Sequence, residues 1–128
     1  MVRPTSDVLT ERETEIMQVL WDRENASSEE IRLALPGDPH DSSVRTILRI
    51  LVKKGHVAVD TAVRPTRYAA KVPKDQLQTK AMKSFLERFF GGSAEDLVVR
   101  LLEDEQLTQE QLNAIRRKVS RRKKKGDS

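Results

Sequence analysis

The 128-residue sequence contains no cysteine, which excludes disulfides, thiolate metal sites and cysteine nucleophiles. No apolar run approaches the roughly 18 residues of a membrane-spanning helix, and the N-terminus lacks the apolar region of a secretory signal. We therefore expect a soluble, cytoplasmic protein. Only 4% of residues are aromatic and 37% are hydrophobic, so the core must be thin, and oligomerisation is a natural way to complete it.

Residues for catalysis are also scarce. The two histidines, His40 and His56, have no neighbouring serine and aspartate in a triad pattern and no metal-ligand spacing. The glycine pair Gly91-Gly92 follows a predicted helix instead of a strand, so it does not form a phosphate-binding loop. The sequence therefore predicts no enzymatic activity, no cofactor and no metal site.

Charge is unevenly distributed along the chain. Residues 1–40 carry four basic against nine acidic residues, whereas residues 41–90 carry eleven against four. Residues 91–115 carry one against six, and residues 116–128 carry eight against one. A basic block inside an otherwise acidic chain favours a polyanionic partner over a merely solvated surface.

Hydrophobic periodicity predicts three short helices in the first half of the chain. Two capping boxes mark the starts of the first two helices, which end near residues 22 and 35: Thr10 with Glu13, and Ser27 with Glu30. The third helix covers residues 41–54, where Asp41 or Ser42 can cap its start and Gly55 can take the left-handed turn at its end.

The third helix has one apolar and one polar face. Its apolar stripe follows helical spacing and consists of Val44, Ile47, Leu48 and Leu51. The polar face has no acidic residue after Asp41 and consists of Ser42, Ser43, Arg45, Thr46, Arg49 and Lys53. Ile50 lies between the two faces. A helix face without acids is suited to contact with phosphate, which an acidic side chain would repel.

A β-hairpin is expected after the third helix. Residues 56–60 and 66–70 contain the valine, threonine and tyrosine that strands favour, and five residues separate them. Three helices followed by a hairpin with a basic tip match a winged helix-turn-helix domain, whose third helix can enter the major groove of DNA. We expect this domain to cover residues 1–72.

The pattern assigns candidate roles to the basic and hydroxyl side chains. Ser42 and Ser43, at the helix start, can donate to phosphate oxygens. Arg45 or Arg49 can form a bidentate pair with guanine, and Thr46 can contact a thymine methyl or a phosphate. Four further cations are candidates for contacts to the DNA backbone: Lys53, Lys54, Arg64 and Arg67.

The C-terminal third predicts a helical dimerisation domain, residues 73–120, followed by a basic disordered tail, residues 121–128. Short helices with one apolar stripe are marginal alone and need a partner surface. The candidate dimer-interface residues are Phe85, Phe89, Leu97, Leu101, Leu102, Leu112 and Ile115. The predicted fold class is therefore mainly α with a small β-hairpin.

Three segments resemble the penicillinase-repressor family of BlaI/MecI/CopY-type winged-helix regulators: EIMQVLWDRENASSEEI (15–31), DSSVRTILRILVKKG (41–55) and RPTRYAA (64–70). Residues 85–119 resemble the C-terminal part of the family. The resemblance implies a homodimer that binds a palindromic operator and represses resistance genes. It also implies that positions 42, 43, 45 and 46 contact DNA from the recognition helix, and that Arg64 and Arg67 are wing arginines.

The same resemblance implies an induction step in the antibiotic-resistance branch, in which a membrane sensor pathway leads to proteolytic cleavage. The matching segment is Leu97 to Leu102, where this chain has Arg100-Leu101 in place of the family's Asn-Phe. Ile50 stands where the family pattern has an arginine. Because the chain has no cysteine, the copper-sensing cluster of the other branch is excluded.

Two other binding functions remain open from the sequence. The hairpin and third helix could form a protein-interaction module that binds an acidic protein partner. RNA binding is less favoured, because the chain has few aromatic residues for base stacking.

Overall fold

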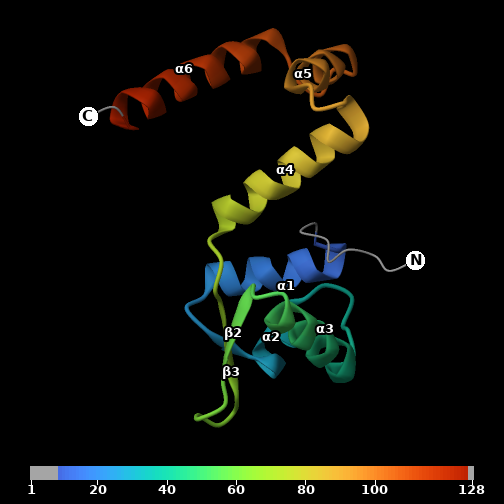
Figure 1. Cartoon of the computed structure of the whole chain (residues 1–128), viewed down its shortest axis with the longest axis vertical. Coiled ribbons are helices and arrows are strands. Elements are labelled where there is room, and N and C mark those ends of the chain that lie inside the picture. The colour runs from blue at the N-terminus through green and yellow to red at the C-terminus, as the bar shows by residue number, and fades with distance from the viewer. Residues whose placement is uncertain (1–8, 127–128) are drawn as a thin grey trace. The chain divides into compact units, whose positions relative to one another are not determined.

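The computed structural model describes the backbone of residues 9–126 and the side chains of residues 9–123. It divides into two compact units, the first ending at Ser84 and the second beginning at Phe85. The elements in chain order are α1 (Glu11–Asp22), β1 (Ala26–Ser27), α2 (Ser28–Ala34), α3 (Asp41–Lys53), β2 (Val57–Asp60), β3 (Arg67–Ala70), α4 (Lys74–Phe90), α5 (Ala94–Glu103) and α6 (Gln109–Gly126) (Figure 1). A mainly helical fold with a small antiparallel sheet is therefore confirmed.

Both predicted capping boxes are present in the first unit. The Thr10 backbone N–H donates to Glu13 Oε1 at 2.8 Å, and the Glu13 N–H donates back to Thr10 Oγ1 at 3.2 Å. Ser27 and Glu30 repeat the arrangement at 3.0 and 3.2 Å. Each pair satisfies backbone donors that would otherwise lack a partner at the helix start.

The predicted cap of α3 is wrong. His40 holds the cap position and makes no side-chain cap hydrogen bond, while Asp41 is already in the first helical turn. There the Asp41 carboxylate accepts from Arg45 Nε at 3.1 Å, one turn along the helix. The end of α3 is as predicted, because Gly55 adopts a φ of 84°, which a residue with a Cβ adopts only at a cost.

The core of the first unit lies where the three helices meet. Its fully or nearly fully buried side chains come from α1, α2, α3, β2 and the first turns of α4, and include Ile16, Met17, Leu20, Ile31, Val44, Leu48, Leu51, Val57 and Leu77. Trp21 is half-buried against this core, and its Nε1–H donates to the Val72 carbonyl at 2.9 Å. Leu77 therefore ties the beginning of α4 to the first unit.

The predicted hairpin is formed by β2 and β3, which pair antiparallel with Val57 opposite Ala70. The sequence did not reveal β1, a two-residue strand that pairs with the other edge of β3 and gives the order β1-β3-β2. Ala26 lies opposite Tyr68 in this pairing. Because α2 starts directly after β1 and Ser27 lies opposite Arg67, the pairing fixes the start of α2 beside the loop end of β3.

The second unit is helical, as expected. Ser93 caps α5 by accepting from the Asp96 N–H at 3.0 Å, and Thr108 forms a capping box with Gln111 at the start of α6. The sequence predicted fraying from residue 121, whereas α6 continues to Gly126. Arginine and lysine have good helix propensities, which accounts for the continuation. The last two residues of the predicted tail lie outside the described residues.

Across residues 9–126, no helix has both the length and the apolar character that a membrane crossing requires.

Candidate nucleic-acid interface

The polar face that the sequence assigns to residues 42–53 is exposed on α3. All six of its predicted side chains are exposed: Ser42, Ser43, Arg45, Thr46, Arg49 and Lys53. Opposite them, Val44, Leu48 and Leu51 of the apolar stripe are buried in the core of the first unit, and Ile47 is half-buried against it. The packing of this stripe therefore determines which side chains α3 presents to a partner.

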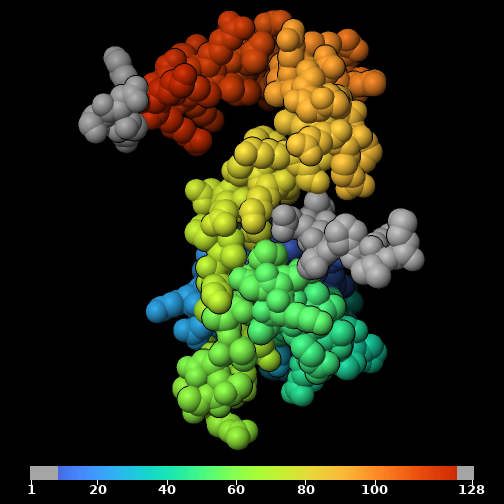
Figure 2. Space-filling model, viewed as in Figure 1, coloured from blue at the N-terminus to red at the C-terminus, as the bar shows by residue number. Residues whose placement is uncertain are grey.

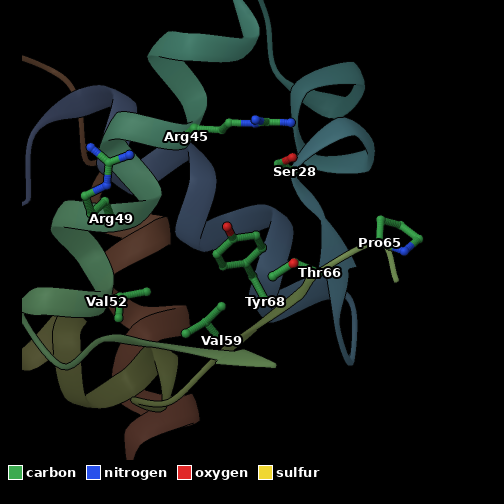
Figure 3. Close-up of a pocket in the computed structure, with 8 residues that line it drawn as sticks. All are labelled: Ser28, Arg45, Arg49, Val52, Val59, Pro65, Thr66 and Tyr68. Atoms are coloured by element: carbon green, nitrogen blue, oxygen red, sulfur yellow. The ribbon is translucent and has the colours of Figure 1, made fainter. Parts of the chain in front are cut away.

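A groove of about 380 Å³ separates α3 from the hairpin (Figure 3). It is lined by Ser28, Arg45, Arg49, Val52, Val59, Pro65, Thr66 and Tyr68. The Tyr68 ring stands between the hairpin and α3, with its hydroxyl directed into the groove (Figure 3). Among the described residues that line the groove, the charged ones are two arginines and none is acidic. The groove is therefore suited to an anionic partner.

The two arginines in the groove differ in their surroundings. Arg45 is held by the Asp41 carboxylate and extends toward Ser28 at the start of α2 (Figure 3). Within residues 9–126, Arg49 has neither an ion pair nor a side-chain hydrogen bond. A guanidinium without a partner forms a new bidentate contact without first breaking an old one. Arg49 is therefore free to bind a partner, whereas Arg45 must first leave Asp41.

Lys54, which the sequence predicts as a DNA-backbone contact, is largely buried and has an acidic partner within the first unit. Its ammonium lies 2.9 Å from Glu13 Oε2, and the side chains of Lys54 and Glu13 are only 17% and 4% exposed. Burial would raise the pKa of Glu13, but hydrogen bonds from Thr10 and Lys54 outweigh it and lower that pKa. The pair connects the end of α3 to the start of α1.

Arg67 also has partners within the first unit. Its guanidinium pairs with Glu30 of α2 and donates to the Asn25 side-chain oxygen at 2.7 Å. Hydrogen bonds from Ser27, together with Arg67, lower the pKa of Glu30 and keep it ionised. Arg67 therefore fastens β3 to α2, whereas Arg64 is exposed in the loop between β2 and β3.

The α3 face and the hairpin loop belong to one continuous part of the surface, drawn in teal to green in Figure 2. Its unpaired cations, within the part of the chain that the structure describes, are Arg49, Lys53 and Arg64. The sequence missed three polar side chains that line the groove, namely Ser28, Thr66 and Tyr68. The sequence identified Tyr68 only as a residue type that strands favour, which did not show that its side chain borders α3.

In the second unit, the predicted interface residues divide into two groups. Phe85, Phe89 and Ile115 are 44%, 65% and 41% exposed. The four leucines are half-buried within the unit: Leu97, Leu101, Leu102 and Leu112. Val99 and Val119 are also exposed, which the sequence did not predict. The aromatic rings of Phe85 and Phe89 lie 5.2 Å apart. Phe85 and Phe89 therefore form an exposed pair of aromatic rings on the second unit.

The bond between Arg100 and Leu101 lies inside α5, with Arg100 exposed and Leu101 half-buried. A protease reaches a bond inside a helix only after local unfolding. Cleavage at this position therefore stays a prediction that depends on the opening of α5.

Comparison with known proteins gives a consistent result over nearly the whole chain. The family model described as "Penicillinase repressor" matches residues 9–121. A penicillinase repressor of Staphylococcus aureus is 24% identical over 106 residues, which cover 81% of this chain and 84% of that protein. The methicillin resistance regulatory protein MecI of Staphylococcus aureus strain N315 is 24% identical over 110 residues, covering 84% and 89%. A penicillinase repressor of Bacillus licheniformis is 27% identical over 110 residues, covering 84% and 85%.

The match spans α1 to α6, and it covers the exposed face of α3, the hairpin and the apolar surface of the second unit. The chain belongs to the penicillinase-repressor family, whose members are transcriptional repressors and not enzymes.

Proposed function

We propose that this chain binds a palindromic duplex operator as a homodimer, with α3 in the major groove and the β2-β3 hairpin as the wing. The observation that carries the proposal is the exposed face of α3, which is free of acids after Asp41 and borders a cationic groove. The major groove is about 12 Å wide, which admits one helix with its side chains.

Each part of this surface has a role in the proposed complex. Ser42 and Ser43 lie in the first turn of α3, where unpaired backbone N–H groups and hydroxyls together bind phosphate. Arg49 reads a guanine, and Lys53 and Arg64 contact phosphates on either side of the groove. Arg45 joins them once it leaves Asp41. The DNA strand between α3 and the wing passes along Tyr68.

The homodimer follows from the exposed apolar side chains of the second unit. Phe85, Phe89 and Ile115 lose water contact when a second copy covers them, and each buried aromatic or aliphatic side chain contributes about 1.5–3 kcal/mol. A twofold dimer presents two copies of α3 to half-sites one helical turn apart, which accounts for a palindromic operator.

The proposed cellular role follows from the names of the relatives, which are regulators of penicillinase and of methicillin resistance. We place an antibiotic-resistance gene under the control of this chain, which acts in the cytoplasm, where the DNA is. Induction in this proposal requires a membrane sensor pathway that ends in cleavage between Arg100 and Leu101. A chain with a Val98→Pro substitution, which disrupts α5 but keeps both residues of this bond, should be cut there faster by an added protease than the wild type.

Selection of bound sequences from random duplexes tests the DNA-binding proposal. The selected site should be palindromic, and affinity for it should fall steeply with salt. Arg49→Ala should weaken binding to the selected site by about 10-fold or more and relax the preference for guanine. Arg100→Ala, which removes an exposed arginine from the second unit, is the matched control and should bind normally.

Sedimentation tests the dimer. Phe89→Asp places a charge on a side chain that is 65% exposed, so the fold should survive while the dimer dissociates. Val63→Asp places the same charge in the hairpin loop and should remain a dimer. A Phe89→Asp chain that is still dimeric refutes this interface. Selection that yields no preferred duplex, together with binding to an acidic protein, would support the interaction-module alternative instead.

A further inference from the structure

One side of α3 carries a stripe without charge. Ser43, Thr46, Ile47 and Ile50 follow the i, i+3, i+4, i+7 spacing that places side chains in a row along a helix. Ser43, Thr46 and Ile50 are exposed, and Ile47 is half-buried at the edge of the core. Arg45 and Arg49 fall on the opposite side, where they line the groove beside the hairpin. The exposed surface of α3 is therefore divided into a cationic side that faces the wing and an uncharged side that faces away from it.

The uncharged side presents carbon more than oxygen. The Thr46 hydroxyl donates to the Ser42 carbonyl at 2.9 Å, so its hydrogen is already engaged within the helix. The Thr46 hydroxyl can therefore only accept from a partner, and its methyl is available for an apolar contact. Ile50 lies one turn further along and is 43% exposed. Ser42, Ser43, Thr46 and Ile47 line a shallow hollow of about 320 Å³ beside them.

The exposure of Ile50 does not arise from the packing of the core. The core face of α3 is filled by Val44, Leu48 and Leu51, each completely buried, and Ile50 points away from them. Ile50 has two exposed neighbours on the helix surface, Thr46 four residues before it and Lys53 three residues after it. Both lie on the face that DNA would meet in the proposed complex. An apolar side chain at this place therefore needs an apolar group within the major groove.

Only one base supplies such a group. Thymine carries a C5-methyl on its major-groove edge, and the other three bases present hydrogen-bond donors and acceptors there. We propose that Ile50 is a specificity-determining residue of this chain and that it contacts the methyl group of a thymine, with the Thr46 methyl beside it. The inference rests on the proposed function and adds which base the uncharged side of α3 selects.

Replacement of thymine by deoxyuridine tests the inference, because uracil lacks only the methyl group. Full-length wild-type protein and Ile50→Ala are titrated with the duplex selected from random sequences, in which each thymine is replaced in turn. Burial of one methyl-sized group corresponds to roughly four-fold in affinity. At one thymine position, replacement by deoxyuridine should lower the affinity of the wild type by about this factor. Replacement in both half-sites should lower the affinity by about the square of this factor.

Ile50→Ala should bind the thymine duplex more weakly and should no longer distinguish it from the deoxyuridine duplex. Ile50→Val, which keeps branched methyl groups, should preserve part of the distinction. The control is Leu33→Ala, which truncates a side chain of α2 that is 69% exposed and should leave thymine discrimination unchanged.

The outcomes separate this inference from the function on which it rests. If a preferred duplex is found, but the affinity ratio between its thymine and deoxyuridine forms is the same for wild type and Ile50→Ala, the proposed function stands and the role of Ile50 is refuted. An Ile50→Ala chain that loses the dimer in sedimentation also overturns it, because Ile50 then belongs to a protein interface. The absence of any preferred duplex overturns the proposed function and this inference together.

Discussion

Alanine substitutions of the two adjacent lysines at the end of α3 should affect different properties, one the stability of the fold and the other the binding of DNA. Lys53 is exposed and has no ion pair within the described residues, whereas Lys54 is paired with the buried carboxylate of Glu13. The sequence assigns both lysines the same role, contact with the DNA backbone. In the structure, only Lys53 is free for that role. Lys54→Ala should therefore reduce stability, and Lys53→Ala should reduce the salt dependence of DNA binding.

The magnitude for Lys54 follows from the burial of the pair. Breaking a fully buried ion pair costs about 3–5 kcal/mol, and an exposed pair contributes about 0–1 kcal/mol. Glu13 is 4% exposed and Lys54 17%, so we expect Lys54→Ala to lower the free energy of unfolding by about 2–3 kcal/mol. For a unit of this size the melting temperature should fall by about 10–20 °C.

The magnitude for Lys53 follows from counterion release. Each phosphate contact contributes about 0.9 to the slope of log affinity against log salt, so loss of one lysine from each copy of a dimer should lower that slope by about 1.8. The melting temperature of Lys53→Ala should stay within a few degrees of that of the wild type, because substitutions at exposed positions change stability little.

The assays are thermal unfolding followed by circular dichroism, and a salt titration of binding at a temperature where every variant is folded. The double variant Lys54→Ala, Glu13→Gln should be more stable than Lys54→Ala alone, because it no longer leaves a buried charge without its partner. If Lys54→Ala melts like the wild type and binds DNA with a lower salt slope, the assignment of Lys54 to the fold is wrong.

Three further predictions concern the first unit. Folding lowers the pKa of Glu13 from its ordinary 4.5, so the stabilisation that the ionised carboxylate provides should be lost as pH falls below about that value. The free energy of unfolding of Glu13→Gln, measured in urea, should therefore depend less on pH in this range. Gly55→Ala should lower the free energy of unfolding in urea by about 1–2 kcal/mol because of its φ of 84°, since no residue beyond its chain neighbours lies within 4 Å of the added carbon; Gly55→Asn should cost less. Arg67→Ala should speed amide exchange at the β1-β3 pairing by releasing Glu30, whereas unchanged exchange would contradict that anchoring role.

The sequence predicted those features of the fold whose partners lie close together along the chain. Each capping box joins residues three positions apart, and the stripe of α3 repeats within two turns, so local spacing was sufficient to find them. The hairpin was found for the same reason. The strand β1 was missed because two residues show no periodicity, and only their pairing with β3 defines them as a strand.

The candidate site was predicted less completely, because its electrostatics depend on contacts that are distant in sequence. Lys54 and Glu13 are 41 positions apart, and Arg67 and Asn25 are 42 positions apart. Nothing in the local pattern of either cation indicates its partner. The prediction of the α3 cap was wrong for a different reason. The Asp41 carboxylate pairs with Arg45 inside the helix and does not accept from the free backbone N–H groups at its start.

These internal pairs change what the basic block of residues 41–90 contributes to DNA binding. If all four cations predicted as backbone contacts bound phosphate, a dimer would gain about 7 in salt slope from them. Lys54 and Arg67 are engaged with Glu13 and Glu30, so only Lys53 and Arg64 are free, and the gain should be about 4. The paired cations instead hold α3 and the hairpin in their places within the first unit. The positive charge of residues 41–90 is thus divided between cations that are free to bind phosphate and cations that position α3 and the hairpin.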